Sequence, residues 1–176
     1  MSDFAPEPEE LDEIQASMED ARLQAASAFR AAYQHQMRGD LAAAEQYYRR
    51  SIELCPTAEA YTFLGWTYSF MGRLEDAIAF CKEAIRTDPE FGNPYNDIGV
   101  YLMQQGKLDE AIPWLEQAKL APRYEPRHYP FSNLGTIYER KGRLTKALAE
   151  YKAALTIEPR HEPAVRAVAR LQAQLN

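Results

Sequence analysis

Hydrophobic residues recur along most of the chain with the spacing of amphipathic helices. Tyr61, Leu64 and Tyr68, for example, lie at positions i, i+3 and i+7, which places them on one helical face. A Gly-x-Leu sequence follows, and a second apolar stripe with helical spacing comes after it. This pattern predicts a helix, a short turn and an antiparallel second helix.

The same pattern occurs four times, in residues 25–57, 58–91, 92–127 and 128–161. Each segment has a glycine, a leucine two places later, an alanine three places after that leucine, and a closing proline. The glycines are Gly39, Gly72, Gly106 and Gly142, with spacings of 33, 34 and 36 residues. The prolines are Pro56, Pro89, Pro122 and Pro159. One helix pair cannot bury its apolar stripe alone, so we expect the pairs to stack into a curved solenoid.

These columns resemble the tetratricopeptide repeat, and the resemblance covers residues 25–161. That family has a bulky residue, then Leu-Gly, then an aromatic residue upstream of the turn glycine. The second segment has Tyr61, Leu64-Gly65 and Tyr68, and the fourth has Phe131, Leu134-Gly135 and Tyr138. The third has Tyr95, Ile98-Gly99 and Leu102, whereas the first is degenerate. The resemblance implies an all-α solenoid of four helix-turn-helix repeats, called repeats 1 to 4 below, whose first helices line a concave face.

The flanking segments complete the expected architecture. Residues 162–176 place Val165, Leu171 and Leu175 on one face and are predicted to form a capping helix. Residues 9–24 also keep helical spacing, and they either extend the first helix of repeat 1 or form a separate N-terminal helix. Residues 1–8 carry two acids and two prolines and are predicted to be a disordered acidic tail.

Composition and charge limit the location and the kind of partner. No apolar run approaches the roughly 20 residues needed to span a bilayer, so no membrane insertion is expected. The first residues have no secretory signal pattern, and we predict a cytoplasmic protein. The net charge of −6 is divided unevenly: residues 1–24 hold eight acids and one base, whereas residues 119–176 hold eleven bases and five acids. Such polarity can steer an oppositely charged partner.

Searches for catalytic and metal-binding patterns identify no site. His35, His128 and His161 fall in different repeats, and their spacing does not predict convergence on a metal ion. Cys55 and Cys81 lack a Cys-x-x-Cys pattern and are expected to be reduced structural thiols. The sequence contains no glycine-rich phosphate loop and no nucleophile elbow. We therefore predict neither an enzyme nor a cofactor.

The predicted function is protein binding by the concave face, because its first-helix positions are unusually apolar for a face that only contacts water. The predicted apolar contacts are Phe29, Tyr33, Met37, Trp66, Phe70, Val100 and Met103. The predicted polar contacts are Asn93, Asn96, Gln104, Thr136 and Arg140. A contiguous exposed apolar patch marks an interaction site, and amides beside it can hydrogen-bond a peptide backbone. We expect a scaffold, adaptor or chaperone-like protein that holds an extended or helical segment of a partner.

Several alternatives remain open at this stage. The N-terminal helix could cover the aromatic residues, either permanently or as a reversible plug. The groove could accept the N-terminal segment of a neighbouring copy, which would make the chain a self-assembling homo-oligomer. The basic C-terminal third could capture an acidic protein segment; nucleic acid is a less favoured partner. Binding of chaperone tails is not expected, because Phe29 and Tyr33 stand where the carboxylate clamp of some family members has lysine and asparagine.

Overall fold

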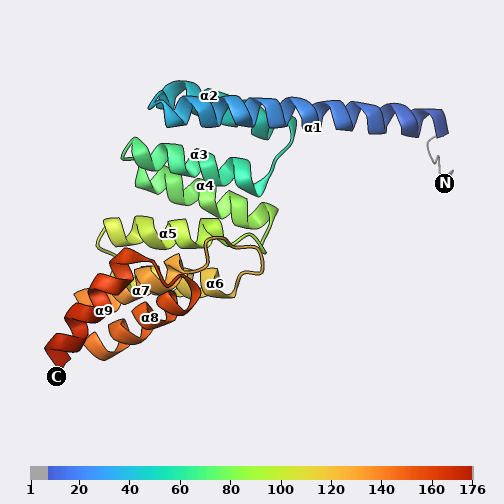
Figure 1. Ribbon diagram of the computed structural model, residues 1–176. Helices are drawn as coiled ribbons and strands as arrows, with labels where there is room; N and C mark the ends of the chain where they lie inside the picture. Colours follow the sequence, from blue (N-terminus) through green and yellow to red (C-terminus); the bar gives the residue numbers. More distant parts are fainter. Residues whose placement is uncertain (1–7, 176) are drawn as a thin grey trace.

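The computed structural model describes residues 8–175, which form nine α-helices that stack in chain order (Figure 1). The helices are α1 (Pro8–Met37), α2 (Leu41–Leu54), α3 (Ala58–Phe70), α4 (Leu74–Thr87), α5 (Asn93–Gln104), α6 (Leu108–Leu120), α7 (Tyr129–Arg140), α8 (Leu144–Ile157) and α9 (Glu162–Leu175). The strongest contacts join the two helices of each repeat, and weaker contacts join each repeat to the next. The prediction of an all-α solenoid is confirmed.

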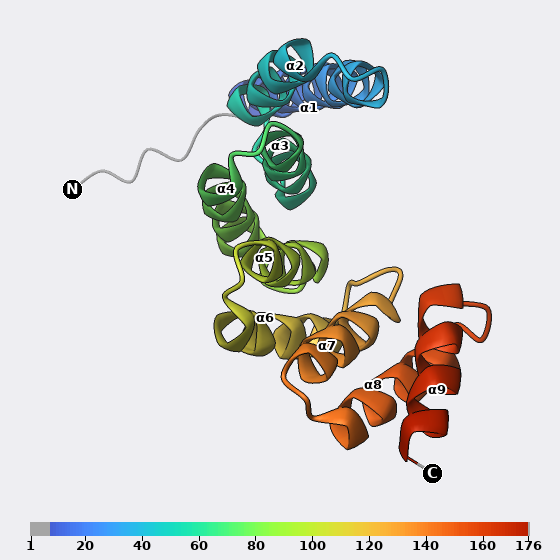
Figure 2. The ribbon, with the colours of Figure 1, turned by 90° about the vertical axis from the view of Figure 1, so that its left-hand side faces the viewer.

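The stack is curved, and its curvature separates an inner from an outer row of helices. Figure 2 shows α3, α5 and α7 on the inner side of the arc and α4 and α6 on the outer side. Contacts between α3 and α5, and between α5 and α7, run along the inner row. The first helices of repeats 2 to 4 therefore form a continuous concave face.

The repeated turn depends on a glycine in the left-handed region of backbone conformation. Gly72, between α3 and α4, has a φ of 76° and donates its N–H to the Ser69 carbonyl oxygen at 3.0 Å. The next residue, Arg73, donates to the Tyr68 carbonyl oxygen at 3.0 Å. Only glycine adopts this conformation without a steric penalty from Cβ, which explains why the glycine column recurs in every repeat.

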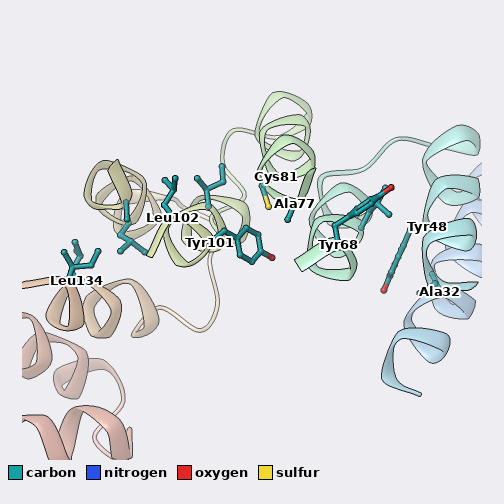
Figure 3. Close-up of a cluster of buried hydrophobic side chains, with 14 residues drawn as sticks. Ala32, Tyr48, Tyr68, Ala77, Cys81, Tyr101, Leu102 and Leu134 are labelled. Atoms are coloured by element: carbon teal, nitrogen blue, oxygen red, sulfur yellow. The ribbon is translucent and has the colours of Figure 1, made fainter. Parts of the chain in front are cut away.

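Small and bulky buried side chains pack together in one long cluster that runs from α1 to α7 (Figure 3). The recurring alanines Ala44, Ala77, Ala111 and Ala147 are fully buried. Gly65 permits a similarly close approach, because an added Cβ would lie 2.9 Å from the Ala77 carbonyl oxygen. A second cluster at the C-terminal end contains Ala164, Ala167 and Leu171 of α9, which cover α8.

The N-terminal half of α1 extends past the rest of the stack. Residues 8–24 continue the first helix of repeat 1 without a break, and every residue from 9 to 20 is exposed. Figure 1 shows this half of α1 reaching beyond α2 and α3. Of the tail predicted over residues 1–8, the first seven lie outside the described residues, and Pro8 begins α1.

The insertion between repeats 3 and 4 folds back onto the preceding junction. Arg123 donates its N–H to the Glu90 carbonyl oxygen at 3.1 Å, and Gly92 donates to the Arg123 carbonyl oxygen at 2.8 Å. Gly92 allows this approach, because an added Cβ would lie 2.4 Å from Cβ of Tyr124. Tyr124 is consequently buried, and the loop forms one wall of the concave face.

Candidate binding groove

Five aromatic rings form a continuous ridge across α1 and α3 on the concave side. Phe63 is its centre, with ring centroids 5.2 Å from Phe29, 5.9 Å from Tyr33 and 5.6 Å from Trp66. Phe70 extends the ridge, 5.4 Å from Trp66. We call Phe29, Tyr33, Phe63, Trp66 and Phe70 the aromatic ridge.

The ridge remains accessible in the folded protein. Tyr33 is 43% exposed, Trp66 38% and Phe70 54%, whereas Phe29 and Phe63 are partly buried beneath them. The projecting half of α1 leads away from the stack and leaves these rings uncovered. Residues 9–24 thus extend the first helix, and the alternative in which they permanently cover the aromatic residues does not describe this structure.

A hollow of about 340 Å³ lies beside the ridge, between α3, α5, α7 and the 121–128 loop. We call it the central hollow. Its lining residues are Thr62, Phe63, Trp66, Asn93, Asn96, Asp97, Val100, Tyr124, Pro126, Tyr129 and Asn133. Four of the residues predicted from the sequence, Trp66, Asn93, Asn96 and Val100, are brought together here. The hollow combines apolar side chains, chiefly Phe63, Trp66 and Val100, with the polar side chains of α5 and α7.

The asparagines of the central hollow are held by one another and by the loop. Asn133 donates its side-chain N–H to Oδ1 of Asn96 at 2.9 Å, and Asn93 donates to the Glu125 carbonyl oxygen at 3.3 Å. These hydrogen bonds orient the amides before any ligand arrives, which lowers the entropy lost on binding.

Asp97 is the one acid that lines the central hollow. Burial raises the pKa of its carboxyl from 3.8 to about 7, and a hydrogen bond from Asn96 acts in the opposite direction. That hydrogen bond is long, with 3.5 Å between Asn96 Nδ2 and Asp97 Oδ1. The charge of Asp97 also acts on its neighbours: burial, followed by the nearby carboxylate, raises the pKa values of Tyr101 and Tyr124.

A second hollow, of about 560 Å³, lies where α1 crosses the junction of α2 and α3. It is largely apolar and is lined by Arg22, Ala25, Ala26, Phe29, Arg30, Ser51, Cys55, Thr57 and Glu59. Phe29 belongs to both this hollow and the ridge, so the two features are continuous through that ring.

The other predicted contact residues lie away from the central hollow. Met37 and Gln104 are exposed at the C-terminal ends of α1 and α5, and Arg140 is exposed at the end of α7. Met103 is partly buried against the core. Thr136 contacts the second helix of its own repeat, with its hydroxyl oxygen 3.1 Å from the Tyr151 hydroxyl oxygen.

Sequence reasoning missed several residues of the site, chiefly Phe63, Asp97, Tyr124 and Asn133. Asp97 and Asn133 occupy equivalent positions, nine residues before the turn glycine, and Phe63 occupies the same position in repeat 2. A signal was present, since this column holds Arg30, Phe63, Asp97 and Asn133 and so varies strongly in chemistry. Tyr124 had no signal, because a loop insertion places it.

Two of the three histidines, which lie far apart in the sequence, contact each other in the structure. The rings of His128 and His161 have centroids 4.5 Å apart, because the turn before α9 packs against the start of α7. His161 Nε2 lies 3.0 Å from the Ser132 hydroxyl oxygen. Burial, and then the neighbouring His128, lowers the pKa of His161. Across residues 8–175, no three His, Cys, Asp or Glu side chains are grouped so that they could hold a metal ion.

Several bases of the C-terminal third are joined to acids of other structural elements. Lys119 lies 3.2 Å from Glu150, and Arg123 lies 2.9 Å from Glu59. Further ion pairs join Arg123 to Asp88, Lys141 to Asp109 and Arg170 to Glu139. Glu59, Asp88 and Asp109 lie outside residues 119–176 and neutralise part of the excess positive charge of that region, which weakens the hypothesis of an acidic partner bound there. Within the described part of the chain, no helix combines the length and apolarity needed to cross a membrane.

Three family models, each described as "Tetratricopeptide repeat", match residues 23–90, 71–129 and 129–161. Small glutamine-rich tetratricopeptide repeat-containing protein 2 of Mycosarcoma maydis is 34% identical over 74 residues, 42% of this chain and 21% of that protein. Tetratricopeptide repeat domain-containing protein PYG7 of Arabidopsis thaliana is 33% identical over 90 residues, 48% of this chain and 29% of that protein. The chain therefore spans less than a third of the length of these curated relatives.

Solved structures show the same fold. Pseudomonas aeruginosa PilF superposes with a TM-score of 0.80 at 20% identity, covering 89% of this chain and 70% of PilF. YrrB, described as a TPR protein with an unusual peptide-binding site, superposes with a TM-score of 0.66 at 20% identity, covering 81% of this chain and 73% of YrrB. At such low identity these likenesses establish the architecture alone.

Proposed function

The chain belongs to the tetratricopeptide repeat family, and we propose that it is a scaffold or adaptor whose concave groove holds a segment of a partner protein. Proteins of this family generally mediate protein–protein interactions. The proposed role is binding rather than catalysis.

The exposed aromatic ridge is the observation that carries this proposal. Covering a large exposed aromatic side chain with a partner removes its apolar surface from water, which is favourable. Such side chains dominate the binding energy of many interfaces. Trp66 and Phe70 are the most useful anchors, because Trp66 lines the central hollow beside its oriented amides and Phe70 packs against Trp66. An extended or helical segment would place apolar side chains on the ridge and polar groups against the amides.

The proposal is tested by replacing both anchors in the Trp66→Ala/Phe70→Ala double variant. Affinity purification with the wild-type chain should enrich partner proteins that the double variant fails to retain. The free energy of unfolding should fall by less than about 2 kcal/mol, because both rings are already partly exposed.

Tyr47→Ala is the matched control. Tyr47 is 43% exposed on α2 and stacks on His35 outside the ridge. This variant should keep the partners of the wild type. Equal retention by all three proteins would place the binding surface elsewhere, and a collapse of the double variant's stability would assign the two rings to the core.

Self-assembly through the N-terminal segment remains the second candidate, because the projecting half of α1 exposes Leu11, Ile14 and Met18. The charge of the groove argues against it. Residues 1–24 hold eight acids and one base, and the carboxyl of Asp97 would repel such a segment. Sedimentation of the full chain and of a variant lacking residues 1–24 distinguishes the two candidates. Only self-assembly predicts that the deletion lowers the number of copies in the sedimenting particle.

A further inference from the structure

The central hollow contains an acid without a counter-ion. Across residues 8–175, Asp97 forms no ion pair, and the hydrogen bond that it accepts is the 3.5 Å contact from Asn96 Nδ2. The residues that line the hollow include no lysine, arginine or histidine. Acids elsewhere on the inner helices differ: Glu59 pairs with Arg123, and Glu139 pairs with Arg170.

An uncompensated carboxyl in this position is unfavourable for the free protein. Burial removes water from the charged form, and no cation of the described chain replaces that water. The fold does not require an acid here, because repeat 4 has the neutral amide Asn133 at the equivalent position and repeat 2 has Phe63. An acid that costs stability and lines a groove is a candidate for binding a ligand.

Resting on the proposed function, we infer that the central hollow takes one basic side chain of the partner segment, lysine or arginine, with Asp97 as its counter-ion.

The surroundings of Asp97 suit both the methylene stem and the charged group of a basic side chain. The Trp66 and Phe63 rings, with Val100, give an apolar wall against which the methylene stem of lysine or arginine packs. The same rings attract a cation held over their faces. Asn93 and the phenols of Tyr124 and Tyr129 supply further oxygen atoms on the hollow's lining. The charged group would thereby exchange its water for a carboxylate and neutral acceptors.

The test uses a displayed library of random dodecapeptides, selected in parallel on the wild type, on Asp97→Asn and on the Trp66→Ala/Phe70→Ala variant. Peptides enriched on the wild type and lost on the double variant should carry a lysine or arginine beside apolar residues. Selection on Asp97→Asn should lose the preference for the basic residue. Asp12→Asn, which removes the same charge from the projecting half of α1, should keep it.

Synthetic peptides then measure the pairing directly. Replacing the basic residue by glutamine should weaken binding to the wild type about tenfold and binding to Asp97→Asn less than about twofold. Unchanged melting of Asp97→Asn, or melting at a higher temperature, confirms that the groove is intact.

The outcomes separate the two hypotheses. Peptides that need the ridge but show no basic residue would overturn the role of Asp97 and leave groove binding in place. An equal preference for basic residues on Asp97→Asn would also overturn it. If the wild type enriches no peptide that depends on Trp66 and Phe70, the proposed function fails and the inference fails with it.

Discussion

At the scale of single residues, the same amino acid meets different physical demands in different columns of the repeat. Gly72 is required for its positive φ, and an added Cβ would meet no atom within 4 Å. Gly65 lies inside a helix and is required for space, since an added Cβ would lie 2.9 Å from the backbone of α4. Asp97 differs from both glycines, because the fold does not need an acid at its position and the acid nevertheless alters the stability of the protein.

Asp97 should make the protein less stable as the pH rises. Its pKa is about 7 in the folded state and near 3.8 in the unfolded chain, so the folded state binds the additional proton between these values. Stability from this group is complete below about pH 4 and is lost as the pH rises through 7.

We therefore predict that Asp97→Asn stabilises the protein most at pH 8 and by only about 1 kcal/mol at pH 4.5. At about 1.4 kcal/mol per pKa unit, the gain at pH 8 has an upper limit of about 4 kcal/mol. Urea unfolding at pH 4.5, 6 and 8 measures the difference between variant and wild type. A difference that is the same at all three pH values would contradict the assigned shift.

At the scale of helices, polar side chains join the last three elements into one unit. The Tyr151 hydroxyl lies 3.1 Å from the Thr136 hydroxyl oxygen and donates to Glu139 Oε2 at 3.2 Å. Arg170 of α9 donates to the same carboxylate oxygen at 3.1 Å. Thr136 is therefore part of the packing between α7 and α8, although its position in the repeat predicted a surface contact.

The pair of histidines at the start of α7 and before α9 should make this end of the molecule sensitive to acid. Burial and the neighbouring His128 lower the pKa of His161, so the unfolded chain binds a proton more readily than the folded one. Stability from His161 is present above the unfolded pKa near 6.5 and is lost as the pH falls below it.

Replacing His161 by glutamine should reduce the loss of stability between pH 7 and pH 5, by less than about 1 kcal/mol because the ring is only partly buried. Denaturant titrations at pH 7, 6 and 5 give the free energy of unfolding of the two proteins, and the slopes of this free energy against pH are compared. Identical slopes would show that the ring does not change its proton affinity on folding.

At the scale of the whole molecule, the two ends of the solenoid differ in what they contribute. In a linear stack, each helix is stabilised by its neighbours alone. The C-terminal helix α9 buries Leu171 completely against α8, whereas residues 9–20 of α1 are all exposed. The N-terminal projection therefore adds helix without adding to the core.

We predict that removing residues 1–20 leaves the melting temperature within about 3 °C of the wild type, whereas Leu171→Ala lowers the free energy of unfolding by about 2–4 kcal/mol. Thermal unfolding followed by circular dichroism measures both. The deletion should also reduce the helical signal in proportion to the helix removed. A large fall in melting temperature after the deletion would mean that the projection stabilises the stack.

The sequence predicted part of the candidate groove and missed the part that depends on packing between distant segments. Trp66, Asn93, Asn96 and Val100 were predicted because the resemblance assigns the first helices to the concave face, and helical periodicity selects the positions beside the packing stripe. Phe63 was missed because its position was assigned neither to the packing face nor to the concave face, and Tyr124 because a loop of irregular length carries it. The approach of His128 to His161 was missed for a similar reason, since a turn that connects two helices sets their distance.

The sequence by itself determined the helix order, the turns and the repeat period, because these depend on interactions between residues a few positions apart. Tertiary structure alone decided that residues 8–24 continue the first helix, that the insertion folds back onto Gly92, and that Asp97 lines a hollow without a basic neighbour. These features depend on how successive helix pairs pack and where a loop comes to rest. Helical periodicity places a residue on a face, and the neighbouring elements decide what that face meets.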